Sequence, residues 1–295
     1  MRRKLVKQGN NALTLSLPYK WLEKHNLSKG DYVNVRELGK DLLISTIENI
    51  KLEKKTYEIN ISKKNPFFKR YIKSCYVLGY DEVLITSDDV IPYNLVKESI
   101  LDLLGYEIIE QTQKRCTVGI LSKLDNGKID VLMKKLFFII QTMFDDLIEL
   151  IRERNLNQIK EVAEVESSVD SFVHFCLRVL NKYGHKEFSK TQYYYNILVL
   201  IEQIADSLRD YSLSFSKKSL ITLGDLILLR DYFINVVKLY LKYNMSEISK
   251  IKKMRQDLYN RIRSNCNKEP LQYLDMYSIL NNLHQFEVVI DPIKN

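Results

Sequence analysis

The stretch Leu198-Val199-Leu200-Ile201-Glu202-Gln203-Ile204-Ala205-Asp206 places two carboxylates four residues apart in an apolar run. The stretch Glu166-Ser167-Ser168-Val169-Asp170 has the same spacing. Four residues is just over one helical turn, so each stretch directs both of its acids to one face of a helix. Two such helices packed side by side could hold a metal cluster between them.

The chain around these stretches is predicted to be nearly all helix from residue 126 onward. Apolar residues recur there at spacings of three and four, the pattern of an amphipathic helix, as in Leu132, Leu136, Ile139, Ile140, Met143, Leu147, Leu150 and Ile151. We expect about six helices of roughly twenty to thirty residues, arranged as two tandem three-helix bundles over 126–215 and 216–295. The predicted breaks lie near Asn155, Gly184, Ser216, Asn244 and Pro270.

Residues 1–47 are predicted to form a small β-rich unit. Alternating polar and apolar residues indicate half-buried strands, at 4–7, 13–17, 32–35 and 41–45, with turns at Gly9-Asn10-Asn11 and around Gly39. Pro18 stands at the first turn of a short predicted helix over 19–25, where its missing N–H costs nothing. Such a unit is too small to bury both faces of its sheet, so we expect it to dimerise.

Residues 48–122 alternate between predicted strands and helices, which is typical of a small α/β module. The sequence predicts strands at 57–61, 82–86, 106–110 and 116–121, and helices at 66–78 and 92–104. The module has no glycine-rich phosphate loop, which argues against nucleotide binding. The expected fold class is therefore multidomain and mainly α.

The charge is unevenly distributed along the chain. The formal net charge is +8, but residues 1–74 hold 17 Lys and Arg against 7 acids, and the remainder holds 28 against 30. A basic head on a nearly neutral body suggests that the head meets a polyanion. A solvated basic face is the alternative interpretation.

Composition excludes several other classes of protein. The chain is 45% hydrophobic and 28% charged, no apolar run approaches the ~20 residues of a membrane span, and residues 1–8 do not resemble a secretory signal. We therefore expect a cytoplasmic protein without membrane insertion. The cysteines are predicted to be buried thiols, because they show no CxxC or other tight spacing; they are Cys75, Cys116, Cys176 and Cys266.

The order of motifs in the head resembles the AbrB/MazE/SpoVT swapped-hairpin DNA-binding domain. The resemblance is carried by Arg3-Lys4-Leu5-Val6-Lys7-Gln8-Gly9, Leu15-Ser16-Leu17-Pro18-Tyr19-Lys20-Trp21-Leu22 and Leu27-Ser28-Lys29-Gly30-Asp31-Tyr32-Val33. In that family two chains interleave their hairpins into one barrel, and exposed basic residues contact DNA. The resemblance implies a homodimer with phosphate contacts from Arg2, Arg3, Lys4, Lys7, Lys20 and Lys24. A head that only dimerises, or binds a protein partner, remains the alternative.

The two E-x-x-x-D stretches resemble those of the PhoU family. Its members are built from two three-helix repeats, regulate phosphate uptake, and bind iron or other multivalent metal ions through these acids. The resemblance implies that iron, Zn, Mn or Mg binds at Glu166, Asp170, Glu202 and Asp206, and carboxylates are suitable ligands for hard cations. A solvated helix face is the alternative. His174, one turn beyond Asp170, is predicted to be a core or rim residue rather than a fifth ligand.

The corresponding stretches of the second half carry few acids. They are Lys253-Met254-Arg255-Gln256-Asp257 and Asn281-Asn282-Leu283-His284-Gln285. Because a lysine repels cations and amides are weak ligands, a second metal cluster is not expected there.

The whole order of domains resembles archaeal PhoU-related regulators with a DNA-binding head. The resemblance implies a DNA-binding regulator of phosphate uptake and homeostasis. An adaptor that contacts a phosphate transporter or a sensor protein, with a head that does not bind DNA, is the alternative. No enzyme is expected, because the chain has no HExxH or Ser-His-Asp arrangement and no residue can be nominated as a catalytic acid or base.

Overall fold

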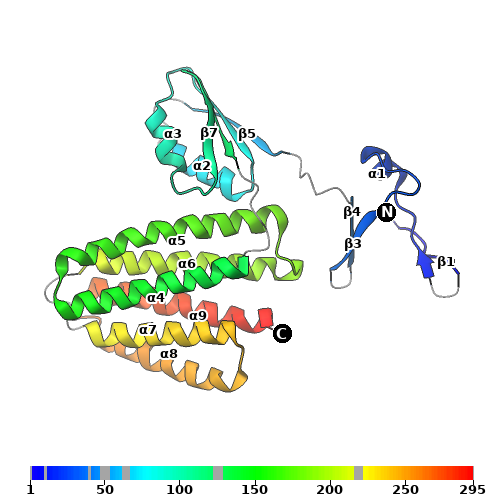
Figure 1. Cartoon of the computed structure of the whole chain (residues 1–295). Helices are drawn as coiled ribbons and strands as arrows, with labels where there is room; N and C mark the ends of the chain where they lie inside the picture. The colour runs from blue at the N-terminus through cyan, green and yellow to red at the C-terminus, as the bar shows by residue number, and fades with distance from the viewer. Residues whose placement is uncertain are drawn as a thin grey trace. The chain divides into compact units, whose positions relative to one another are not determined.

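The computed structural model describes residues 2–9, 12–38, 41–46, 54–61, 67–121, 129–215 and 222–294. The chain divides into two compact units, Met1–Glu53 and Lys54–Asn295, and the elements of both are labelled in Figure 1. As predicted, a β-rich N-terminal region precedes a mainly helical part. The boundaries predicted near residues 48 and 122 lie outside the described residues.

The N-terminal unit contains two separate hairpins and one short helix. Strand β1 (Val6–Gln8) pairs antiparallel with β2 (Ala12–Thr14), and β3 (Val33–Leu38) pairs antiparallel with β4 (Asp41–Thr46). Helix α1 (Tyr19–Lys24) follows Pro18, whose φ of −65° is the value that its ring imposes. Strands β1 and β2 are shorter than predicted, and the predicted turn residues Asn10, Asn11 and Gly39 lie outside the described residues.

Among its described residues, this unit shows no hydrophobic core within one chain. None of its side chains whose exposure is described is buried. Several apolar side chains of the hairpins are more than 40% exposed, namely Leu5, Val6, Leu13, Leu15, Val35 and Leu42. Isolated two-stranded hairpins are marginally stable in water. A further surface that covers these apolar side chains would therefore stabilise the unit.

The α/β module has a four-stranded mixed sheet with two helices. Its elements are β5 (Thr56–Asn60), α2 (Phe68–Val77), β6 (Glu82–Thr86), α3 (Tyr93–Ile100), β7 (Tyr106–Gln111) and β8 (Arg115–Ile120). The strand order is β5-β6-β8-β7; β5 and β6 are parallel, and the other pairs are antiparallel. The prediction of a helix to residue 104 was wrong, because α3 ends at Ile100 and the chain turns through Gly105 at a φ of +82°.

The rest of the described chain contains six long helices. They are α4 (Ile129–Glu153), α5 (Leu156–Tyr183), α6 (Thr191–Leu213), α7 (Leu223–Leu241), α8 (Met245–Asn265) and α9 (Pro270–Lys294). A short 3-10 helix, η2 (Phe188–Lys190), precedes α6. The number of helices and the breaks near Asn155, Gly184, Asn244 and Pro270 agree with the prediction, while Ser216 is outside the described residues. None of the described helices is long and apolar enough to cross a membrane.

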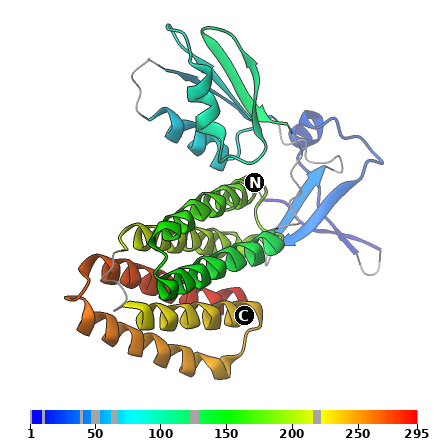
Figure 2. The ribbon, with the colours of Figure 1, turned by 60° about the vertical axis from the view of Figure 1, so that its left-hand side comes forward.

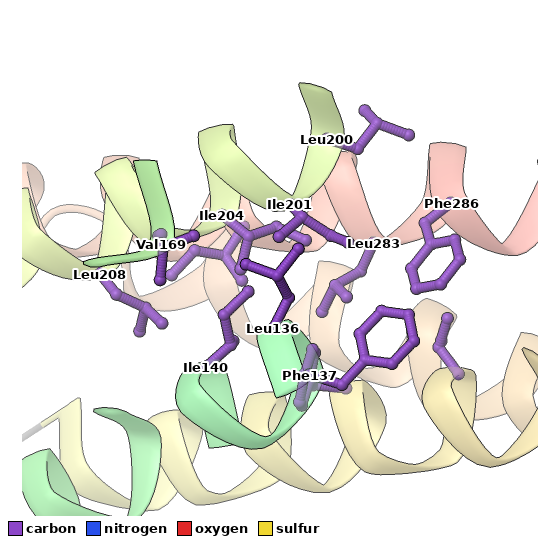
Figure 3. Close-up of a cluster of buried hydrophobic side chains, with 14 of the residues drawn as sticks. Leu136, Phe137, Ile140, Val169, Leu200, Ile201, Ile204, Leu208, Leu283 and Phe286 are labelled. Atoms are coloured by element: carbon purple, nitrogen blue, oxygen red, sulfur yellow. The ribbon is translucent and has the colours of Figure 1, made fainter. Parts of the chain in front are cut away.

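All six helices contribute to one hydrophobic core. The first three helices pack on one another, as do the last three, and the contacts α4–α7 and α6–α9 join the two sets (Figures 1 and 2). Figure 3 shows Phe137 of α4 close to Leu283 and Phe286 of α9. Burying side chains of this size stabilises the fold by about 1.5–3 kcal/mol each.

The cysteines are free thiols. Cys75 and Cys116 are buried in the α/β module and Cys176 in the helical core, as predicted, whereas Cys266 is half-buried. Burial raises the pKa of Cys176 to about 12, so that this thiol is protonated and unreactive at neutral pH.

Candidate metal centre

Helix α5 carries one stripe of polar side chains at four-residue spacing. The stripe runs Glu166, Asp170, His174, Arg178 and Lys182, so it changes from acidic to basic along the helix. The spacing of one turn keeps these side chains on one side. The apolar core residues of α5, which include Val169, Val173, Cys176, Leu177 and Leu180, are placed between them in sequence.

Asp170 and His174 of α5 meet Glu202 of α6. One ligand atom from each of the three side chains lies within 4.8 Å of the others. His174 is 3% exposed, and its Nε2 lies 3.5 Å from Glu202 Oε1. Among the described residues, Asp170 Oδ1 and both ring nitrogens of His174 are buried without a hydrogen-bond partner. Buried polar atoms usually have partners, so this group is suited to bind a cation.

Of the four predicted acids, Asp170 and Glu202 belong to the group with metal-binding spacing. Glu166 and Asp206 instead form ion pairs with Arg209 of α6. The Nη1 atom of Arg209 lies 3.1 Å from Glu166 Oε1 and 2.7 Å from Asp206 Oδ1. Glu166 and Asp206 therefore share one guanidinium group of the protein itself. His174, which the sequence favoured as a core or rim residue, is buried but joins Asp170 and Glu202.

The titration behaviour of the acids reflects this division. The nearby His174 ring, whose Nε2 lies 3.5 Å from Glu202 Oε1, is the largest cause of the lowered pKa of Glu202. Lys73 lowers the pKa of Glu202 further. Burial, then the charge of Glu202, raise the pKa of Asp170. Burial and the charge of Asp170 raise the pKa of Glu166, and they outweigh the attraction of Arg209. Asp170 and Glu166 are thus less compensated by positive charge than Glu202.

The α/β module contributes a cation to the same site. Lys73 of α2 places its Nζ 3.6 Å from Glu202 Oε1 and 4.0 Å from Asp170 Oδ2. One turn further along α5, Arg178 donates hydrogen bonds to the carbonyl oxygens of Tyr76 and Tyr80 at 2.9 and 2.6 Å, and to Asp81 at 3.0 Å. The module and the bundle are therefore connected directly beside the candidate metal ligands.

The stretches of the second half that correspond to the two E-x-x-x-D stretches present few acids. Lys253 and Asp257 are exposed, and Asn281 lines a cavity of about 330 Å³ with Arg255 and His284. In the described part of the chain, no second group of acids and histidines has metal-binding spacing.

The six basic residues predicted to bind DNA are all exposed. They are Arg2, Arg3, Lys4, Lys7, Lys20 and Lys24. Exposure makes them available to neutralise phosphates.

Sequence reasoning missed Lys73 and Arg209 as partners of the acids. The stripe on α5 could have been continued by one-turn steps to Arg178 and Lys182. Nothing near Lys73 in the sequence indicates its partners, because they lie on α5 and α6. Compared with known proteins, the chain matches no family model, no curated protein and no solved structure.

Proposed function

We propose that the chain is a homodimeric DNA-binding regulator whose helical body binds a metal ion, and that it acts in phosphate uptake and homeostasis. The phosphate role rests on the motif resemblance of the head and of the E-x-x-x-D stretches. The dimer, the DNA contact and the metal site have additional support from the structure.

The observation that carries the proposal is that the N-terminal unit exposes both apolar and basic side chains. Its hairpins leave apolar residues such as Leu5 and Leu13 more than 60% exposed, and its basic residues are exposed as well. A second copy of the unit would cover the apolar side chains, as in a swapped-hairpin barrel. The two copies would then present a doubled set of basic residues to a DNA duplex, which carries dense negative charge.

The helical body supports a PhoU-like interpretation in two respects. Helices α4, α5 and α6 pack together, and α7, α8 and α9 pack together, which is the arrangement expected of tandem three-helix bundles. The candidate metal ligands lie on the second and third helices, as the resemblance implies.

Asp170, His174 and Glu202 would hold the metal ion. The imidazole among the ligands favours iron or Zn, the two carboxylates also suit Mn, and Mg is less favoured because it prefers oxygen ligands alone. Bound there, the ion would supply positive charge to a buried and partly uncompensated site. Glu166 and Asp206, paired with Arg209, would lie outside the immediate ligand set. We assign no catalytic residue, and the proposed role of the site is regulatory.

The proposal is tested by DNA binding across salt concentrations. Duplexes selected from a random library are bound by the full-length chain, and the logarithm of the association constant is plotted against the logarithm of salt. Changing Arg2, Arg3 and Lys7 together to Gln should reduce the slope by about 5, because both chains of the dimer lose these phosphate contacts and each contact contributes about 0.9. The matched control changes Lys250, Lys252 and Lys253 of α8 to Gln and should leave the slope unchanged.

Binding that is absent or independent of salt would contradict the DNA-binding role. Phosphate regulation that survives the head substitutions in cells would instead favour the adaptor, in which the body contacts a phosphate transporter or a sensor protein. The metal part of the proposal requires that Mn²⁺ binding is lost in Glu202→Gln.

A further inference from the structure

Lys73 lies where it competes with a metal ion for two of the three candidate ligands. Its Nζ is 3.6 Å from Glu202 Oε1 and 4.0 Å from Asp170 Oδ2. At these distances an ammonium group attracts both carboxylates and repels a divalent cation that approaches them. The protein therefore carries its own counter-ion for the site.

Lys73 can exchange its contact with the two acids for contact with water. Its side chain is 40% exposed, and a lysine has a flexible stem of four carbons that can place the ammonium in water instead. Ion pairs exposed to this degree contribute little to stability. Lys73 can therefore leave the acids without disrupting the fold.

A second, buried set of contacts keeps helix α2 attached to α5. Arg178 and Asp81 form an ion pair at 3.0 Å with side chains that are only 4% and 10% exposed, and Lys182 also bonds to Asp81. Arg178 reaches the carbonyl oxygens of Tyr76 and Tyr80, at the end of α2 and just beyond it. The module thus stays docked through Arg178 whether or not Lys73 touches the acids.

We propose that Lys73 is an internal competitor of the metal ion, and that metal binding releases its ammonium group from Asp170 and Glu202 into solvent. The inference rests on the metal site proposed above and concerns the regulation of that site. The Lys73 ammonium group and the metal ion cannot occupy the site together. Any shift of helix α2 that strengthens the contact of Lys73 with Asp170 and Glu202 therefore lowers the affinity for the metal ion. By the same linkage, metal binding changes the charged surface of the α/β module.

The first test measures the affinity of the full-length chain for Mn²⁺ by isothermal titration calorimetry. Lys73→Gln removes the competing charge and should raise the affinity about tenfold or more, given the size of charge repulsion at this separation. The matched control is Lys69→Gln, which makes the same change one turn earlier on α2. Lys69 pairs with Asp102 at 3.4 Å, so its loss should leave Mn²⁺ affinity unchanged.

The second test uses the unaltered chain and therefore does not depend on how a variant folds. Amine acetylation is followed residue by residue by mass spectrometry, with and without Mn²⁺. Labelling of Lys73 should rise when Mn²⁺ is added, while labelling of Lys69 stays constant. The rise should disappear in Glu202→Gln, which lacks a metal ligand.

The outcomes separate this inference from the metal site itself. Equal Mn²⁺ affinity of the original chain and Lys73→Gln, with unchanged labelling of Lys73, overturns the competition and leaves the metal site standing. Failure of both chains to bind Mn²⁺ overturns the metal site and the competition together.

Discussion

Arg178 is a buried cation whose hydrogen-bond partners come from the α/β module. It is 3% exposed and donates to the carbonyl oxygens of Tyr76 and Tyr80 and to the carboxylate of Asp81. Its guanidinium also lies over the Tyr76 ring, 5.1 Å from the centroid, which adds a cation–π attraction. The planar fork of an arginine can satisfy several acceptors at once, which a lysine ammonium does less well.

Replacing Arg178 by Met should therefore destabilise the chain strongly. Breaking a buried ion pair by removing one partner costs about 3–5 kcal/mol, because Asp81 would remain as a buried charge with less compensation. Thermal and urea unfolding, followed by circular dichroism, measure the change. The control is Arg152→Met on the exposed side of α4, which should change stability by less than ~0.5 kcal/mol. Equal stabilities of the two variants would contradict this account of Arg178.

At the scale of one element, helix α5 joins the metal ligands to the module. Its length of 28 residues spans about 42 Å at 1.5 Å per residue, so acidic and basic parts of its stripe have different neighbours. The acids approach α6, and Arg178 and Lys182 approach Asp81. The helix ends at Gly184, whose φ of +71° and ψ of 178° suit only glycine.

Two glycine substitutions test whether the end of α5 depends on this conformation. Gly184→Ala should destabilise the chain by about 1–3 kcal/mol, because its Cβ would also lie 2.9 Å from the Phe188 ring. Gly224→Ala, at the start of α7, has no atom within 4 Å of its Cβ and should be neutral or stabilising by up to ~1 kcal/mol. Urea unfolding compares both variants with the original chain. Similar effects at the two positions would contradict the assigned role of Gly184.

At the scale of the whole molecule, the two units differ in how they are stabilised. The unit from Lys54 to Asn295 buries extended cores in its module and its bundle, so each can be stable within one chain. The unit from Met1 to Glu53 shows no buried side chain among those described. Association of chains through the head would supply the missing burial.

The predicted association can be measured directly. Sedimentation equilibrium of the full-length chain should give twice the monomer mass of 34.9 kDa. Leu13→Lys should shift the equilibrium to monomer, because Leu13 is 64% exposed within one chain and burial of a charge is unfavourable. Leu101→Lys in the module, at a residue 75% exposed, is the control and should leave the dimer intact. If the Leu13→Lys variant remains dimeric, the dimer interface does not include Leu13.

Local sequence signals were sufficient for most of the helix and strand boundaries. Strand β6 lies at 82–86 as predicted, and the long helices break near Asn155, Gly184, Asn244 and Pro270 as predicted. Such boundaries depend on periodicity, on glycine and proline, and on hydrogen bonds between near neighbours. Strands β1 and β2, which are shorter than predicted, and helix α3, which ends at Ile100 instead of residue 104, were exceptions.

The sequence by itself determined that Glu166, Asp170, Glu202 and Asp206 lie in pairs on helix faces. Only the tertiary structure decided which of these acids share a cation. Lys73 contacts Asp170 and Glu202, and Arg209 pairs with Glu166 and Asp206. The physical reason is that helix formation depends on interactions within a few residues, whereas charge pairing depends on distances in space. Those distances depend on the packing of α2 and α6 against α5.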